Sequence, residues 1–178
     1  RELSVKYNLS KNISFETTAY KGSVSDVLNR ETSTYGYNEI IDIEQEGLEN
    51  SFALKNKNQR LMLSSTFSKS REGNGRPQLR RPEKQFGVNY TKKIISNFFG
   101  TFDLIYDYRH VGKVEDWKNG SVREKVDSSD IMNLSFSKKI SKNLWSLNIF
   151  NLTDEVYQRP DTYNQERRRI GLSFRHRY

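Results

Sequence analysis

The sequence contains no cysteine, only three prolines and only two histidines in 178 residues. The absence of cysteine excludes a disulfide-linked scaffold and a cysteine-based metal site. No apolar run approaches the roughly 18 residues that a transmembrane helix requires, so such a helix is also excluded. Hydrophobic residues make up 34% of the chain and its mean hydropathy is -0.88, and both values are low for the core of a soluble globular protein.

Aromatic residues, by contrast, are abundant, with ten Tyr and ten Phe, so the composition is not that of a disordered chain. The net charge is +8, from 30 Lys and Arg against 22 Asp and Glu. These basic residues are spread along the chain and not gathered in one stripe, which favours a solvated surface over nucleic-acid binding.

A short basic segment recurs along the chain. It reads "YNLSKNISF" at 7–15, "LKNKNQRLML" at 54–63, "YTKKIISNFF" at 90–99 and "FSKKISKNLW" at 136–145. This spacing indicates a repeated structural unit. A propeller blade does not fit, because each repeat has room for two strands where a blade needs four.

Apolar and polar residues alternate on both sides of each basic segment, which predicts strands with one apolar and one polar face. The pattern predicts about nine strands, at 2–9, 12–25, 37–54, 59–69, 84–94, 98–111, 129–140, 143–152 and 167–178. Short turns at the basic segments alternate with long connections at 26–36, 70–83, 112–128 and 153–166.

These features together predict an all-β protein, an antiparallel transmembrane β-barrel whose apolar side chains face lipid. Lysines at the short turns would lie near phospholipid headgroups, beside an aromatic girdle that includes Phe98, Phe99 and Trp145. About 8–9 strands and a start at Arg1 without a leader predict a fragment or a processed product, because single-chain bacterial barrels have even strand numbers.

The stretch 37–54 is less regular. Ile41 and Ile43 fall in one phase of the alternation and Leu48, Phe52 and Leu54 in the other, which predicts a bulge near Gly47. The acidic residues of this stretch are interpreted as a polar lining and not as a catalytic pair: Asp42, Glu44, Glu46 and Glu49.

The last third, "NIFNLTDEVYQRPDTYNQERRRIGLSFRHRY" (148–178), resembles TonB-dependent outer-membrane receptors. The likeness is carried by Asn151, Leu152, Asp154, Tyr157, Tyr163, one of Arg167–Arg169, and Tyr178. The segments at 35–49, 80–90 and 108–121 resemble the family in the same order. The chain departs from the family pattern in lacking a Gly before the Arg of the last strand and in placing His176 at an apolar position.

The resemblance implies that residues 1–178 form the C-terminal portion of a barrel of about 22 strands, with the N-terminal plug domain and the TonB box absent from this chain. It implies an outer-membrane receptor of a Gram-negative bacterium that imports a scarce ligand, such as siderophore-iron or cobalamin, energised through TonB. Expected partners are outer-membrane lipids and lipopolysaccharide, the TonB complex through the missing part, and a metal-chelate ligand. The barrel assembly machinery is a further partner, and Phe174 and Tyr178 are its expected C-terminal signal.

No catalytic grouping is found, so neither an enzyme nor a cofactor is expected. His110 and His176 lie on different predicted strands without a patterned metal-binding partner, so no metal site is expected. Arginine and aromatic side chains suit anionic metal chelates, which makes the long loops the candidate ligand surface, although lipopolysaccharide contact or solvation explains the same residues. The candidate ligand contacts are Arg71, Asn74, Arg76, Arg80, Arg81, Trp117, Lys118, Arg159 and Tyr163.

Two other functions remain open. A small, complete outer-membrane barrel or porin would have a structural or passive-diffusion role. An outer-membrane barrel enzyme would need a Ser/His/Asp-type grouping near one rim.

Overall fold

The computed structural model describes residues 1–29, 39–118, 122–159 and 163–176, which form eleven strands. The strands are β1 (Glu2–Ser10), β2 (Ile13–Asn29), β3 (Glu39–Lys55), β4 (Gln59–Glu72), β5 (Lys84–Ser96), β6 (Gly100–Val111), β7 (Val114–Lys118), β8 (Val122–Val126), β9 (Ser129–Ile140), β10 (Asn143–Phe150) and β11 (Arg169–His176). None of the described residues belongs to a helix long and apolar enough to cross a membrane.

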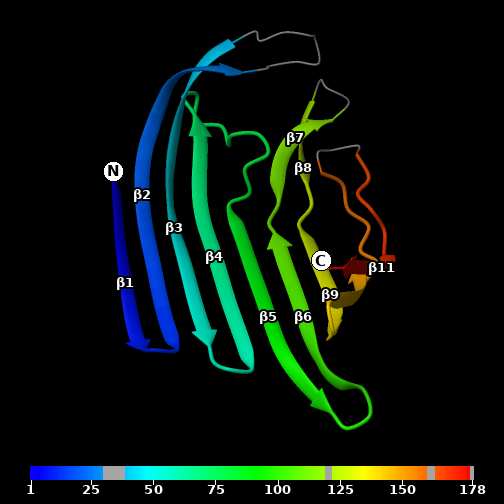
Figure 1. The fold of residues 1–178 in the computed structure, drawn as a ribbon. Helices are drawn as coiled ribbons and strands as arrows, with labels where there is room; N and C mark the ends of the chain where they lie inside the picture. The colour runs from blue at the N-terminus through cyan, green and yellow to red at the C-terminus, as the bar shows by residue number, and fades with distance from the viewer. Residues whose placement is uncertain (30–38, 119–121, 160–162, 177–178) are drawn as a thin grey trace.

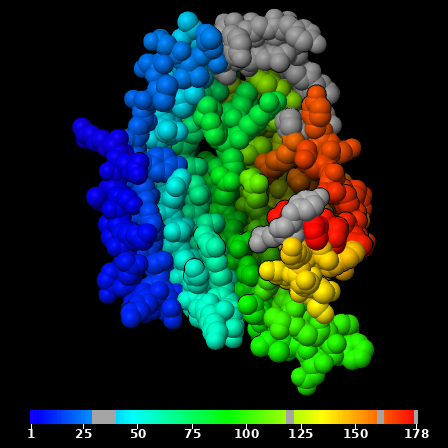
Figure 2. Space-filling view, in the orientation of Figure 1, coloured from blue at the N-terminus to red at the C-terminus, as the bar shows by residue number. Residues whose placement is uncertain are grey.

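Nine of the strands form one antiparallel sheet in the order β1-β2-β3-β4-β5-β6-β9-β10-β11, and β7 and β8 form a separate hairpin. Figure 1 shows this sheet as a curved wall, with the short turns at its lower end and the long connections at its upper end. Figure 2 shows the β5–β6 turn (green) projecting below the other turns. The predicted all-β fold with antiparallel strands is confirmed. Among the described residues the sheet is open, with β1 and β11 at its two edges.

The sheet has one apolar face and one polar face. Side chains alternate between the two sides along each strand, and directly paired residues of neighbouring strands point to the same side. Leu147, for example, pairs with Phe136 on β9 and with Leu172 on β11. The apolar face is represented on successive strands of the sheet by Leu3, Phe15, Phe52, Leu63, Val88, Leu104, Leu134, Leu147 and Leu172.

The apolar face is largely open to its surroundings. Leu172 is 73% exposed, and the buried hydrophobic residues of the described chain are only Ile41, Ile43 and Val114. All three lie near the long-loop end of the sheet, away from the apolar face. A sheet that exposes its apolar side and has so small a core is suited to a hydrocarbon environment.

The polar face is held together by hydrogen bonds between side chains of adjacent strands. Asp107 accepts hydrogen bonds from the side-chain amides of Asn89 (3.5 Å) and Asn133 (3.4 Å), and Ser135 donates to Asn148 at 2.5 Å. These contacts favour one register, because a slip of one residue would move each polar group to the apolar side.

Three polar residues interrupt the apolar face on neighbouring strands. Thr17 donates through its hydroxyl to Asn50 Oδ1 at 2.8 Å, and Asn50 Nδ2 donates to Ser65 Oγ at 3.2 Å. The three side chains therefore satisfy one another within an apolar surface, which lowers the cost of placing them there.

The predicted bulge near Gly47 is wrong. β3 pairs without interruption through Gly47 with both β2 and β4, and the register shift lies on β2 between Val24 and Val27. Ile41 and Ile43 fall on the polar side of a regular strand, at the long-loop end of the sheet, where they are buried. The apolar residues of β3 therefore change sides because the side of the sheet that is covered by other residues changes along the strand.

The predicted long connection 112–128 contains β7 and β8. Each of these strands has five residues, reading VEDWK and VREKV, and they pair with each other from Val114↔Val126 to Lys118↔Val122. Their charged residues conceal the alternation that identified the longer strands.

Candidate functional site

The long-loop end of the sheet is organised by arginines that join separate connections. Arg123 of β8 donates from Nη2 to both carboxylate oxygens of Glu72, at 2.8 Å each, and from Nη1 to the carbonyl of Pro77 at 3.3 Å. The Glu72 and Arg123 side chains are 1% and 13% exposed. A charge-assisted hydrogen bond is stronger than a neutral one, so this buried ion pair anchors the β7–β8 hairpin to the end of β4.

A second arginine joins the same two regions. Arg80 Nε donates to Asp116 Oδ1 at 2.8 Å, and the Arg80 backbone N–H donates to the carbonyl of Glu115 at 2.8 Å. The Asp116 side chain is 1% exposed, whereas that of Arg80 is 61% exposed. Arg80, predicted as a ligand contact, therefore has a structural partner in the hairpin.

Arg159 secures the base of the hairpin from the last connection. Its Nη2 donates to the carbonyls of Val111, Gly112 and Asp127, at 3.1, 3.0 and 3.1 Å. Desolvation, together with the charge of Arg109, lowers the pKa of Arg159. Because its acceptors lie on both sides of the hairpin, Arg159 closes the hairpin at its root.

The Asn151–Asp154 motif forms the start of the last connection. Asn151 is 4% exposed and has a positive φ of 50°, a conformation that asparagine tolerates better than most residues. Its Nδ2 donates to the carbonyls of Glu155 (2.9 Å) and Glu166 (3.1 Å), and its Oδ1 accepts from the Glu155 N–H at 2.9 Å. Asn151 thus bridges the two ends of the connection.

Asp154 makes a parallel bridge to the approach to β11. Arg167 donates to its two carboxylate oxygens at 2.9 and 2.6 Å, and the Arg168 N–H donates to Oδ1 at 2.8 Å. The hydrogen bonds from the Arg167 side chain, and to a smaller extent that from the Arg168 backbone, hold the pKa of Asp154 well below its usual range. The partner of the motif is therefore Arg167 among the three consecutive arginines.

The other candidate ligand contacts differ in their surroundings. Arg71 is exposed and donates to the carbonyl of Gly75 at 3.0 Å, and Asn74 caps the following turn by accepting from the Arg76 N–H at 2.9 Å. Arg81 is exposed, and Tyr163 is 66% exposed.

Trp117 is half-buried, and the Arg123 guanidinium lies 5.2 Å from its ring centroid. The side chain of Lys118 lies outside the described part of the structure. Ligand contact by any of the nine candidates remains a prediction.

Of the two residues of the expected assembly signal, Phe174 lies on the apolar face, where its ring centroid is 4.7 Å from that of Trp145. Tyr178 is outside the described residues. His110 has an acidic neighbour that the sequence pattern did not reveal: Asp130 lies 2.8 Å from its Nδ1 and also accepts a 2.6 Å hydrogen bond from Tyr108.

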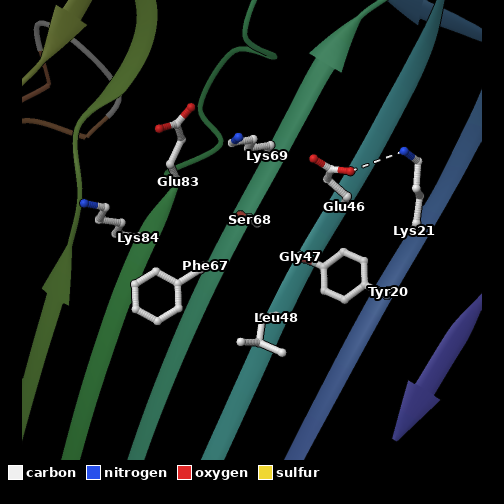
Figure 3. Close-up of a pocket in the computed structure, with 10 residues that line it drawn as sticks. All are labelled: Tyr20, Lys21, Glu46, Gly47, Leu48, Phe67, Ser68, Lys69, Glu83 and Lys84. Carbon is white, nitrogen blue, oxygen red and sulfur yellow. Dashed lines mark ion pairs between the residues drawn. The ribbon is translucent and has the colours of Figure 1, made fainter.

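The apolar face ends below the long loops in a pocket of about 480 Å³ across β2–β5. Figure 3 shows Leu48 and Phe67 of the apolar face at its lower side and charged side chains at its upper side, whereas Tyr20 pairs with Gly47 on the other side of the sheet. Those charges have both signs and include the Lys21–Glu46 pair at 3.4 Å. The pocket therefore marks a sharp border between an apolar and a charged surface.

The acidic residues of β3 are divided by this geometry. Glu46 and Glu44 lie on the same side of the sheet as Leu48, beyond the border, whereas Glu49 lies on the polar face. The interpretation as a polar lining is therefore wrong for Glu44 and Glu46 and consistent with the position of Glu49.

No protein-family model and no curated protein sequence matches the chain. Its fold does match solved structures. The ferripyoverdine receptor of the outer membrane of Pseudomonas aeruginosa matches with a TM-score of 0.74 and 15% identity, over 98% of this chain and 26% of the receptor.

The ferric preacinetobactin receptor of Acinetobacter baumannii matches with a TM-score of 0.68 and 20% identity, over 97% of this chain and 28% of the receptor. The FrpB iron transporter of Neisseria meningitidis matches with a TM-score of 0.73 and 11% identity, over 97% of this chain and 30% of the transporter. This chain thus spans less than a third of each of these three proteins. Its fold is that of one part of a receptor barrel, as the resemblance to TonB-dependent receptors implied.

Proposed function

We propose that this chain is the C-terminal part of the barrel wall of an outer-membrane receptor that imports a scarce metal chelate with energy supplied through TonB. The observation that carries the proposal is the nine-stranded sheet with an open apolar face. Nearly the whole of this chain matches solved outer-membrane receptors, and the match covers 26% to 30% of the length of each receptor. Further strands would close the barrel against the edges β1 and β11, and a plug domain with the TonB box would lie in the rest of the receptor.

In this orientation the short turns face the periplasm and the long loops face the exterior. The ligand is a metal chelate of the siderophore-iron or cobalamin class, contacted by exposed groups such as Arg71, Arg76, Arg81 and Tyr163. Arg80 and Arg159 serve mainly to position the loops, because their guanidinium groups bind the hairpin.

The charged border of the apolar face would meet lipopolysaccharide, whose phosphates and acyl chains match its two sides. Phe174 and Tyr178 would be read by the barrel assembly machinery during insertion.

Uptake of labelled chelates tests the proposal. The full-length receptor is expressed in a Gram-negative strain without its own siderophore receptors, with and without TonB. The probes are ⁵⁵Fe-loaded catecholate and hydroxamate siderophores and ⁵⁷Co-cobalamin. We expect one probe to accumulate only when both the receptor and TonB are present.

Accumulation that is independent of TonB would contradict the proposal and favour the alternative, a small barrel or porin with a passive role. Failure of every probe to accumulate would also contradict the proposed ligand class.

A further inference from the structure

A groove opens on the apolar face at the short-turn end of the sheet. Its volume is about 410 Å³, which is within the size range of ligand sites. Trp145 and Phe102 line it, and their rings contact those of Phe174 (4.7 Å between centroids) and Phe136 (6.3 Å), respectively. The remaining apolar residues that line it are Phe99, Leu147 and Leu172.

Lys138 is the one charged side chain among the described residues that line this groove. It pairs across the sheet with Trp145, and its Nζ donates to the carbonyl oxygen of Phe99 at 2.6 Å. This hydrogen bond draws the ammonium group toward the β5–β6 turn. An ammonium group has three N–H donors, so two remain for an anion at the same place.

The surroundings of Lys138 favour an anion. No acidic residue of the described chain lines the groove, and the nearby Asp103 belongs to the polar face, where it pairs with Lys93 and Ser137. The β9–β10 turn adds further positive charge through Lys142. The combination of an apolar groove with a cation at its end matches a lipid tail joined to an anionic headgroup.

We propose that this groove binds one anionic phospholipid of the periplasmic leaflet. The inference rests on the proposed outer-membrane orientation of the sheet. An acyl chain lies against Phe136 and Leu147, and the lipid phosphate accepts hydrogen bonds from the Lys138 ammonium. An anionic lipid is preferred because a zwitterionic headgroup brings its own cation to the same place.

Native mass spectrometry of the full-length receptor tests the site. The detergent-solubilised receptor is titrated with phosphatidylglycerol or with phosphatidylcholine of the same acyl chains. Lys138→Gln should weaken binding of phosphatidylglycerol about fivefold, since one lysine near an anionic membrane surface contributes on the order of 1 kcal/mol. It should weaken phosphatidylcholine binding less, because the choline cation already opposes Lys138, and Lys138→Arg should retain the preference.

Lys139→Gln is the matched control, because it removes the same charge one residue along β9, from the opposite face of the sheet. Equal retention of phosphatidylglycerol by the wild type and Lys138→Gln would overturn the inference, as would an equal loss in Lys139→Gln. Uptake of chelates by Lys138→Gln should remain at the wild-type level. Uptake by the wild type therefore tests the proposed function, whereas the loss of phosphatidylglycerol in Lys138→Gln tests this site.

Discussion

Arg123 and Glu72 lie 51 residues apart in the sequence and meet in a nearly dry ion pair, in which one guanidinium nitrogen lies 2.8 Å from both carboxylate oxygens. The pair joins the end of β4 to a hairpin that stands between β6 and β9. Together with the contacts of Arg80 and Arg159, this pair links the β4–β5 connection, the β7–β8 hairpin and the connection before β11.

Removal of one partner of this pair should loosen the hairpin strongly. Arg123→Ala leaves the buried Glu72 carboxylate without its guanidinium, and such a loss costs about 3 kcal/mol. Hydrogen exchange of the β7–β8 amides in the folded protein measures the opening of the hairpin. Arg81→Ala removes an exposed arginine of the neighbouring loop and serves as the control. Unchanged exchange in Arg123→Ala would show that the pair does not hold the hairpin.

Gly47 is expected to resist substitution. A Cβ at this position would lie 2.5 Å from the Tyr20 hydroxyl oxygen and 2.7 Å from the backbone oxygen of Phe67. Gly47→Ala should therefore lower the free energy of unfolding by about 1–3 kcal/mol, measured by urea unfolding of the refolded receptor. Gly22→Ala, on the adjacent strand with no atom within 4 Å of the new Cβ, should be nearly neutral. Equal effects of the two substitutions would contradict the close contact.

The Asp154–Arg167 bridge should make stability depend on acidic pH. The pKa of Asp154 is lower in the folded chain than its ordinary value of 3.8, so the bridge stabilises the folded state fully above that value. As the pH falls below 3.8 toward the lower folded pKa, this contribution is progressively lost. The difference in thermal midpoint between the wild type and Asp154→Asn should shrink from pH 5 to pH 2. A constant difference would argue against the bridge.

The polar contact between Thr17 and Asn50 on the apolar face should be weakly coupled. Hydrogen bonds between side chains in membranes contribute about 0.6 kcal/mol on average, because the unfolded chain also finds partners. A double-mutant cycle with Thr17→Val and Asn50→Leu in lipid vesicles measures this coupling. A coupling energy of zero would mean that the 2.8 Å contact does not persist in lipid.

Features set by residues close together in the sequence could be predicted, whereas contacts between residues far apart in the sequence could not. The strands of the sheet were predictable because alternation is local and one face is apolar throughout, as in β9, which begins and ends at the predicted residues. The Arg80–Asp116 contact was not predictable, because it depends on how a loop meets a hairpin 36 residues away. Ile41 and Ile43 were misread as the sign of a bulge because their burial comes from the packing at the long-loop end.

Asn151 and Asp154 lie at the boundary between the strands of the sheet and the connection that joins β10 to β11. Each joins the two ends of the last connection, so these contacts support the register of β10 with β11 below the connection. Apart from Arg159, which holds the β7–β8 hairpin, we expect the stretch between those two ends to tolerate changes of sequence while the strands remain paired. Under the proposed function, it is a place to exchange ligand specificity or to graft a foreign peptide for display.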